Sequence, residues 1–156
     1  MNRILLLLLL FALVPCLLKA QQVAAIDTSD IYYTTLKRYC EDRELKSTVI
    51  LVEKESVFTD NIPSAIGTVK VEVIDLDNLH FNKGEIKIVF RFSMLPYKPG
   101  RHNRFDVMLT EYHVTLKSKG KDKAFGLRDC GGATMGFDFD CERQKLVPAS
   151  YYLIQH

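Results

Sequence analysis

The sequence predicts a mainly β fold, namely an antiparallel β-sandwich of about seven short strands with one N-terminal helix. Two observations predict strands: apolar and polar side chains alternate along residues 68–75 and 85–94, and turn-forming residues separate the apolar runs. A period of two places each set of side chains on one face of a pleated strand. A third observation, a single stretch with helical character, leaves an alternative α+β arrangement open, in which one curved antiparallel sheet packs on the helix. Both arrangements are expected to be antiparallel, because no second helix is available for parallel crossovers.

The first twenty residues are expected to be a signal peptide rather than part of the fold. Residues 1–3 supply a positive charge, residues 4–18 are almost wholly apolar, and Ala20 ends the segment with a small side chain. The apolar run is shorter than the roughly 20 residues that a membrane-spanning helix needs. We therefore expect cleavage after Ala20, which leaves residues 21–156 as a single secreted, extracellular domain with no stable membrane insertion.

The charge balance argues against nucleic acid as a partner. The chain carries 21 basic and 19 acidic residues, a formal net charge of +2. The expected cleavage removes Arg3 and Lys19 and no acidic residue, so the mature chain is close to neutral. A neutral chain lacks the overall positive field that non-specific binding to nucleic acid requires.

Three cysteines remain after the expected cleavage, namely Cys40, Cys130 and Cys141. In an oxidising compartment they should form one disulfide and leave one thiol. We expect the pair Cys130–Cys141, because the loop between them is short and rich in glycine, although three pairings are possible in principle.

The first half of the mature chain should hold the helix and three strands. Residues 27–30 offer several capping side chains, and apolar residues recur at helical spacing up to residue 44, so we expect a helix over 29–44. Residues 48–52 are β-branched and apolar, which favours a buried strand. Two further strands are expected at about 66–76 and 84–94, joined by a turn-prone loop.

The second half should be entirely β. Residues 105–117 form the longest expected strand, and their alternation changes register near Thr110–Glu111, which indicates a β-bulge or a strand that passes between sheets. Residues 117–123 should form a hairpin tip. A short strand is expected at 124–129, a turn at Gly131–Gly132, and a last strand over 146–154 that Pro148 interrupts.

No set of residues predicts an enzyme, a metal site or a cofactor. Nucleophilic catalysis needs a nucleophile, a base and an orienting group, and no sequence context of this kind surrounds any histidine. His80 and His102 lie in expected loops, His113 lies on an expected strand, and His156 ends the chain. We therefore expect a non-catalytic protein.

Two basic loop tips, one at each end of the strand 105–117, are the most specific candidates for binding. We expect the protein to bind an extracellular protein or a sulfated glycan, either through such loops or through a sheet edge. The candidate binding residues are Lys98, Arg101, His102 and Arg104 at one tip, and Lys117, Lys119, Lys121 and Lys123 at the other. Two alternatives stay open. One is a carrier that holds an apolar ligand such as a lipid between aromatic core residues. The other is a hydrolase or protease inhibitor, which no sequence motif supports.

A few short segments resemble small secreted transthyretin-like proteins. The similar segments are Pro63, the alternating strand Val69–Asp75, the pair Asp129-Cys130, and Pro148–Tyr151 near the end. The resemblance covers about thirty residues and implies a sandwich fold. It assigns no functional residue.

Overall fold

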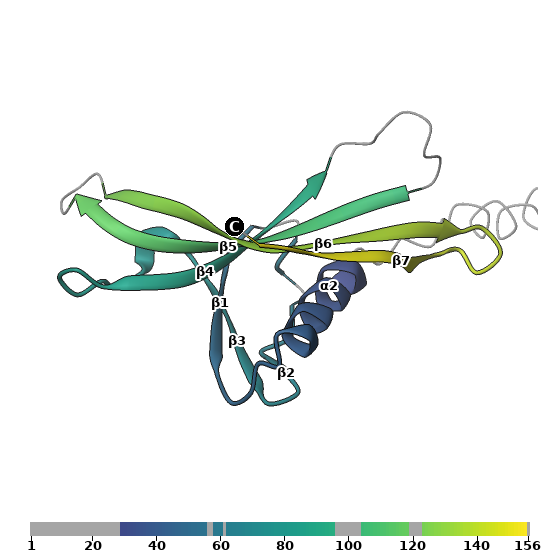
Figure 1. Ribbon diagram of the computed structural model, residues 1–156, viewed down its shortest axis with the longest axis horizontal. Helices are drawn as coiled ribbons and strands as arrows, with labels where there is room; N and C mark the ends of the chain where they lie inside the picture. The colour runs from purple at the N-terminus through teal and green to yellow at the C-terminus, as the bar shows by residue number, and fades with distance from the viewer. Residues whose placement is uncertain (1–28, 56–57, 61, 96–103, 119–122, 156) are drawn as a thin grey trace, which may run out of the picture.

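The described part of the chain folds into one helix packed against one seven-stranded sheet (Figure 1). The computed structural model describes residues 29–55, 58–60, 62–95, 104–118 and 123–155. The strand order in the sheet is β2-β3-β1-β4-β5-β6-β7. The elements are helix α2 (Ser29–Asp42), β1 (Val49–Glu53), β2 (Ala65–Ile66), β3 (Val69–Ile74), the 3₁₀ turn η1 (Leu76–Asn78), β4 (Ile86–Leu95), β5 (Arg104–Ser118), β6 (Ala124–Asp140) and β7 (Lys145–Ile154).

A mainly β chain with one N-terminal helix was predicted, and this coarse description is confirmed. The sandwich is not confirmed, because the described strands belong to one sheet. The expectation of purely antiparallel pairing is wrong for β1, which runs parallel to both β3 and β4. A parallel connection needs about a dozen residues but no helix, and the described residues between β1 and β3 include β2 and no helix.

Helix α2 buries one stripe of side chains against the sheet. The stripe recurs every three or four residues and includes Leu36 and Tyr39, which are almost fully buried. Thr35 lies in the same stripe, and its hydroxyl donates a hydrogen bond to the Ile31 carbonyl at 2.7 Å. This bond satisfies a polar group that would otherwise destabilise the core.

The helix ends in a Schellman motif. The Leu45 amide donates to the Cys40 carbonyl at 3.0 Å, and the Glu44 amide donates to the Glu41 carbonyl at 3.1 Å. Glu44 takes the left-handed conformation, with φ +50°, where glycine is usual. The motif turns Leu45 back against the core and fixes how the chain enters β1.

The helix covers only one half of the sheet face. The buried side chains beneath it come from the first half of β5 and the second half of β6, for example Val107, Leu109 and Met135. Two edge-to-face aromatic pairs join the layers: Tyr32 with Phe92, and Tyr39 with Phe90, with ring centroids 5.3 and 5.4 Å apart. In Figure 1 the helix lies under the right half of the long strands, and the start of β4, the end of β5 and the start of β6 extend beyond it to the left.

Strand β6 continues through the two glycines where a turn was expected. The predicted irregularity near Thr110–Glu111 is confirmed, because the pairing of β5 with β6 shifts between Thr110 and Tyr112. Two residues of β6, Cys130 and Gly131, stand opposite the single residue Glu111 there, which is a β-bulge. The predicted turn at Gly131–Gly132 is therefore wrong: the two glycines absorb the bulge within one strand.

The two edges of the sheet are short or interrupted. Strand β2 has two residues. Strand β7 contains Pro148, which has no amide hydrogen to donate, and its pairing with β6 shifts between Gly136 and Phe137. Proline and irregular pairing are known means of discouraging edge-to-edge association.

The expected disulfide between Cys130 and Cys141 is not present. Cys40, Cys130 and Cys141 are all free in the described part of the chain. Cys130 lies within β6, and Cys141 follows its last residue, so the two lie about 35 Å apart along an extended strand. A disulfide needs Cα atoms within about 7 Å. The glycine-rich segment between them was read as a loop, and its extension as a strand separates the thiols.

We predict that Gly132→Ala strongly destabilises the fold. Gly132 has φ +146°, and a Cβ atom there would overlap the carbonyl oxygen of Leu109 on β5. Because this oxygen belongs to the backbone, the strand itself would have to move, and we expect a loss of about 2–4 kcal/mol in the free energy of unfolding.

The matched control is Gly84→Ala, since Gly84 also has a positive φ, of +76°, but open space around the added methyl group. It should cost about 1 kcal/mol through the backbone conformation alone. Chemical denaturation of both variants measures the difference. Equal losses would contradict the close approach of β6 to β5.

Candidate functional site

The uncovered half of the helix-side sheet face forms a mixed apolar and basic surface, which we call the arm face. Residues that pair directly across neighbouring strands lie on the same face, and the register places Ile88 opposite His113, and His113 opposite Arg128. In the next row Ile86 pairs with Thr115, and Thr115 pairs with Gly126. The arm face therefore consists of Ile86 and Ile88 on β4, His113, Thr115 and Lys117 on β5, and Gly126 and Arg128 on β6.

Lys117 belongs to this surface because its side chain lies over Gly126, with Cε at 2.7 Å from where a Cβ atom would be. Arg128 is exposed. The apolar residues of the arm face thus lie on β4, and the basic residues lie on β5 and β6.

A pocket of about 350 Å³ opens beside the arm face, and we call it the Tyr39 pocket. It lies where β1 and β4 separate, because these strands pair only at Leu51–Val89 and Val52–Phe90. The end of helix α2 closes one side. The lining residues are Tyr39, Arg43, Leu45, Thr48, Val49, Ile50, Ile88, Phe90 and Glu111.

Tyr39, Arg43 and Glu111 converge in the Tyr39 pocket, whose lining also includes Thr48 and five apolar residues. The Tyr39 hydroxyl donates a hydrogen bond to Glu111 Oε2 at 2.7 Å. Arg43 Nε donates weakly to the same hydroxyl at 3.4 Å, and the guanidinium lies 5.8 Å from the Tyr39 ring centroid. His113 Nε2 lies 3.9 Å from Glu111 Oε1. An apolar cavity with a few convergent polar groups is the usual form of a ligand site.

Burial raises the pKa of Tyr39 to about 12. The nearby carboxylate of Glu111 also raises this pKa, since it accepts a hydrogen bond from the neutral hydroxyl and repels the phenolate, whereas Arg43 lowers it. Tyr39 is therefore a neutral donor at physiological pH. It joins the end of the helix to β5 through Glu111.

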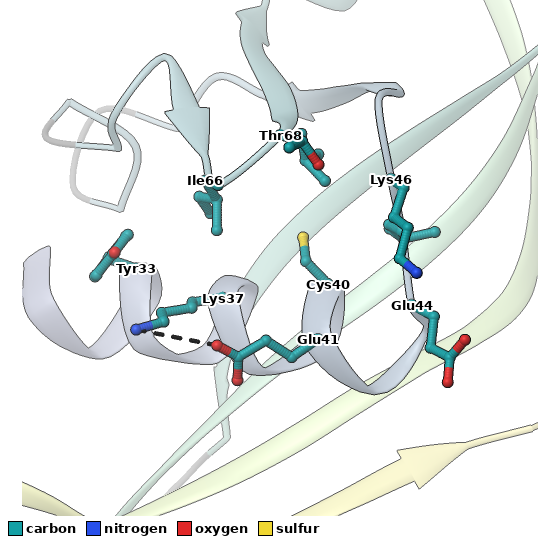
Figure 2. Close-up of a pocket in the computed structure, with 11 residues that line it drawn as sticks. Tyr33, Lys37, Cys40, Glu41, Glu44, Lys46, Ile66 and Thr68 are labelled. Atoms are coloured by element: carbon teal, nitrogen blue, oxygen red, sulfur yellow. Dashed lines mark ion pairs between the residues drawn. The ribbon is translucent and has the colours of Figure 1, made fainter.

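A second, wider pocket of about 740 Å³ lies on the other side of Leu45, between helix α2 and the β2–β3 hairpin. Figure 2 shows Cys40 on the helix opposite Ile66 and Thr68, with Lys37 and Glu41 paired at the rim. Cys40 is buried, and burial raises the pKa of its thiol to about 11, so the thiol is not a nucleophile at neutral pH. The charges at this rim belong to ion pairs and to solvent-facing side chains, and they do not converge on the cavity.

The described residues of the two predicted basic tips make different contacts. Arg104 donates to Asp106 Oδ1 at 2.9 Å and also contacts the Ser150 hydroxyl, across Gly136 on the outer face. Lys123 donates to the Asp77 carbonyl. Lys117 lies on the arm face. Lys98, Arg101, His102, Lys119 and Lys121 lie outside the described residues.

Arg104 and Lys117 stand at opposite ends of β5, so the structure does not bring the two tips together. The expected signal peptide, residues 1–20, also lies outside the described residues. No helix in the described ranges is long and apolar enough to cross a membrane, and the same ranges contain no group of three or more residues that could hold a metal ion.

Sequence reasoning missed most of the Tyr39 pocket. Tyr39 and Arg43 were read only as part of a helix, and Glu111 only as the position of a register change. These residues meet because helix α2 packs against β4 and β5, and a contact between such distant segments is not predicted by any local pattern. The one available signal was the row of alternating residues Ile86, Ile88, Phe90 and Phe92, of which the last two are buried and the first two are exposed.

Comparison of the chain with family models, with curated proteins and with solved structures finds no match. The resemblance to transthyretin-like proteins gains no support from these comparisons, and the sandwich that it implied is not confirmed. The functional argument therefore rests on the geometry of the arm face and the Tyr39 pocket.

We predict that the contribution of Tyr39 to stability is lost at high pH. An unfolded tyrosine ionises near its ordinary pKa of 10.0, whereas folded Tyr39 ionises near 12. A raised pKa stabilises the fold fully below pH 10, and this contribution declines as the pH rises toward 12, by about 1–2 kcal/mol.

Denaturation curves of the wild type and of Tyr39→Phe over this range measure the effect, since the other titrating groups are common to both proteins. Tyr152→Phe, which alters an exposed tyrosine, is the control and should follow the wild type. If Tyr39→Phe also follows the wild-type profile, the phenol is not held in its neutral form by its surroundings.

Proposed function

We propose that this chain is an exported, non-catalytic binding domain that recognises an extracellular protein through the arm face and the Tyr39 pocket. One observation carries the proposal. Val49, Ile86 and Ile88 are 51%, 59% and 47% exposed, although each is a large apolar side chain in a β-strand, and two of them line the pocket.

Exposure at this place is informative because the side chains are clustered. Single apolar residues at a surface are ordinary, but adjacent ones beside a cavity are typical of interaction sites. Complete burial of an isoleucine is worth about 1.5–3 kcal/mol. Burial of Ile86 and Ile88 by a partner would therefore stabilise the complex by an amount that the isolated domain lacks.

The other parts of the proposal rest on the sequence. Export rests on the signal-peptide features of residues 1–20. A non-catalytic role rests on the absence of a recognisable catalytic motif in the sequence. Among the described polar groups of the pocket, Tyr39 and Glu111 are engaged with one another, which suits recognition better than proton transfer.

A selection of random peptides displayed on phage tests the proposal. Peptides selected on the wild type should lose binding to Ile88→Asp by about tenfold or more, because the substitution places a charge at the mouth of an apolar pocket. Leu153→Asp on β7 is the matched control: Leu153 is another exposed apolar strand residue, and it lies at the edge of the sheet remote from β4. Selected peptides that bind all three proteins equally would refute recognition through this surface.

The volume of the Tyr39 pocket also supports a second candidate, a carrier of an apolar small ligand. About 350 Å³ lies at the lower end of the range for small-molecule sites, and Leu45, Ile50 and Phe90 supply apolar walls. Native mass spectrometry of the secreted protein should then detect an added mass that disappears in Ile50→Trp, which fills the cavity. A wild-type spectrum with the polypeptide mass alone would argue against a carrier.

A further inference from the structure

We infer that the arm face binds an acidic segment of a partner protein, which inserts one apolar side chain into the Tyr39 pocket. This inference rests on the proposed function and adds the chemistry of the partner. It follows from three features of the surface: the sign of its charges, the distance of these charges from the pocket, and the carboxylate inside the pocket.

The charges of the arm face have one sign. The surface carries the charged side chains of Lys117 and Arg128, and no residue that defines it is acidic. Arg43 adds a further positive charge at the edge of the pocket. Lys117 and Arg128 make no ion pair among the described residues. Such a surface attracts an acidic partner and repels a basic one.

The position of the charges sets the spacing within the partner. His113 and Arg128 stand one and two strands away from Ile88, which corresponds to about 5 and 10 Å. An extended segment advances about 3.3 Å per residue. Carboxylates two to four residues from the inserted side chain would therefore reach the basic residues.

The pocket itself selects an uncharged side chain. Its volume of about 350 Å³ accommodates one large side chain, and Phe90, Leu45 and Ile50 form its walls. Glu111 lies in the lining and already accepts a hydrogen bond from the Tyr39 hydroxyl. The negative charge of Glu111 would therefore repel a second carboxylate inserted into the pocket. The acidic residues of the partner must then lie over the arm face.

A sulfated glycan would satisfy the charges but not the apolar residues. It has no apolar side chain to insert, and it would leave Val49 and Ile88 in contact with water. The observations therefore favour a polypeptide over a glycan, and the experiment below separates the two.

The test uses the peptides selected from the random library on the wild-type chain. These peptides should be enriched in an aromatic or aliphatic residue with aspartate or glutamate two to four positions away. The double variant Arg128→Glu/Lys117→Glu should weaken their binding by about tenfold or more, and the loss should be larger at low salt than at high salt. Lys145→Glu, an exposed basic residue at the start of β7, is the matched charge-reversal control and should bind as the wild type does.

Two outcomes would overturn the inference. In the first outcome, the selected peptides bind Ile88→Asp weakly but bind Arg128→Glu/Lys117→Glu as tightly as the wild type. This result would refute an acidic partner and leave the proposed function in place. In the second outcome, heparin binds the wild type and competes with the peptides. If the double variant loses heparin binding and Ile88→Asp keeps it, the surface is assigned to a glycan instead. Ile88, Lys117 and Arg128 are all exposed, so each variant is expected to fold, and circular dichroism checks this.

Discussion

The structure depends on the packing of a short helix against strands that are much longer than it is. Helix α2 has 14 residues and β6 has 17, and because an α-helix rises about 1.5 Å per residue and a strand about 3.3 Å, the helix spans about 21 Å and the strand about 55 Å. One helix therefore cannot cover the face of the sheet. The buried core lies where the helix reaches, and the arm face begins where it ends.

The mixed topology adds a second consequence at the same place. Because β1 runs parallel to β4 over only two residue pairs, the strands separate toward the end of the helix, and the Tyr39 pocket occupies the space between them. The hydrogen bond between Tyr39 and Glu111 links the helix to β5 and lies in the wall of this pocket. A hydrogen bond to a charged group is worth about 1.5–3 kcal/mol, and this one is partly buried, so the wall of the pocket contributes to stability.

The sequence predicted the local elements better than their assembly. Alternation located β4 and β5 to within a few residues, and the register change at Thr110–Glu111 located the bulge. The glycine pair Gly131–Gly132 was misread as a turn, because a strand that bends through a bulge uses the same residue type. Parallel pairing of β1 and the separation of Cys130 from Cys141 depend on contacts between distant segments, which local patterns do not encode. The candidate site follows the same rule, since Tyr39, Ile88 and Glu111 come from three separate elements.

The interrupted strand β7 bears on how the molecule behaves at high concentration. Amyloid-like growth requires a long, regular row of unpaired backbone groups onto which a further chain can add. Pro148 and the shifted pairing beside it break that row at one margin of the sheet, and β2 offers only two residues at the other. The domain can thus leave Ile86 and Ile88 exposed while it offers a growing fibril little backbone onto which a further chain could add.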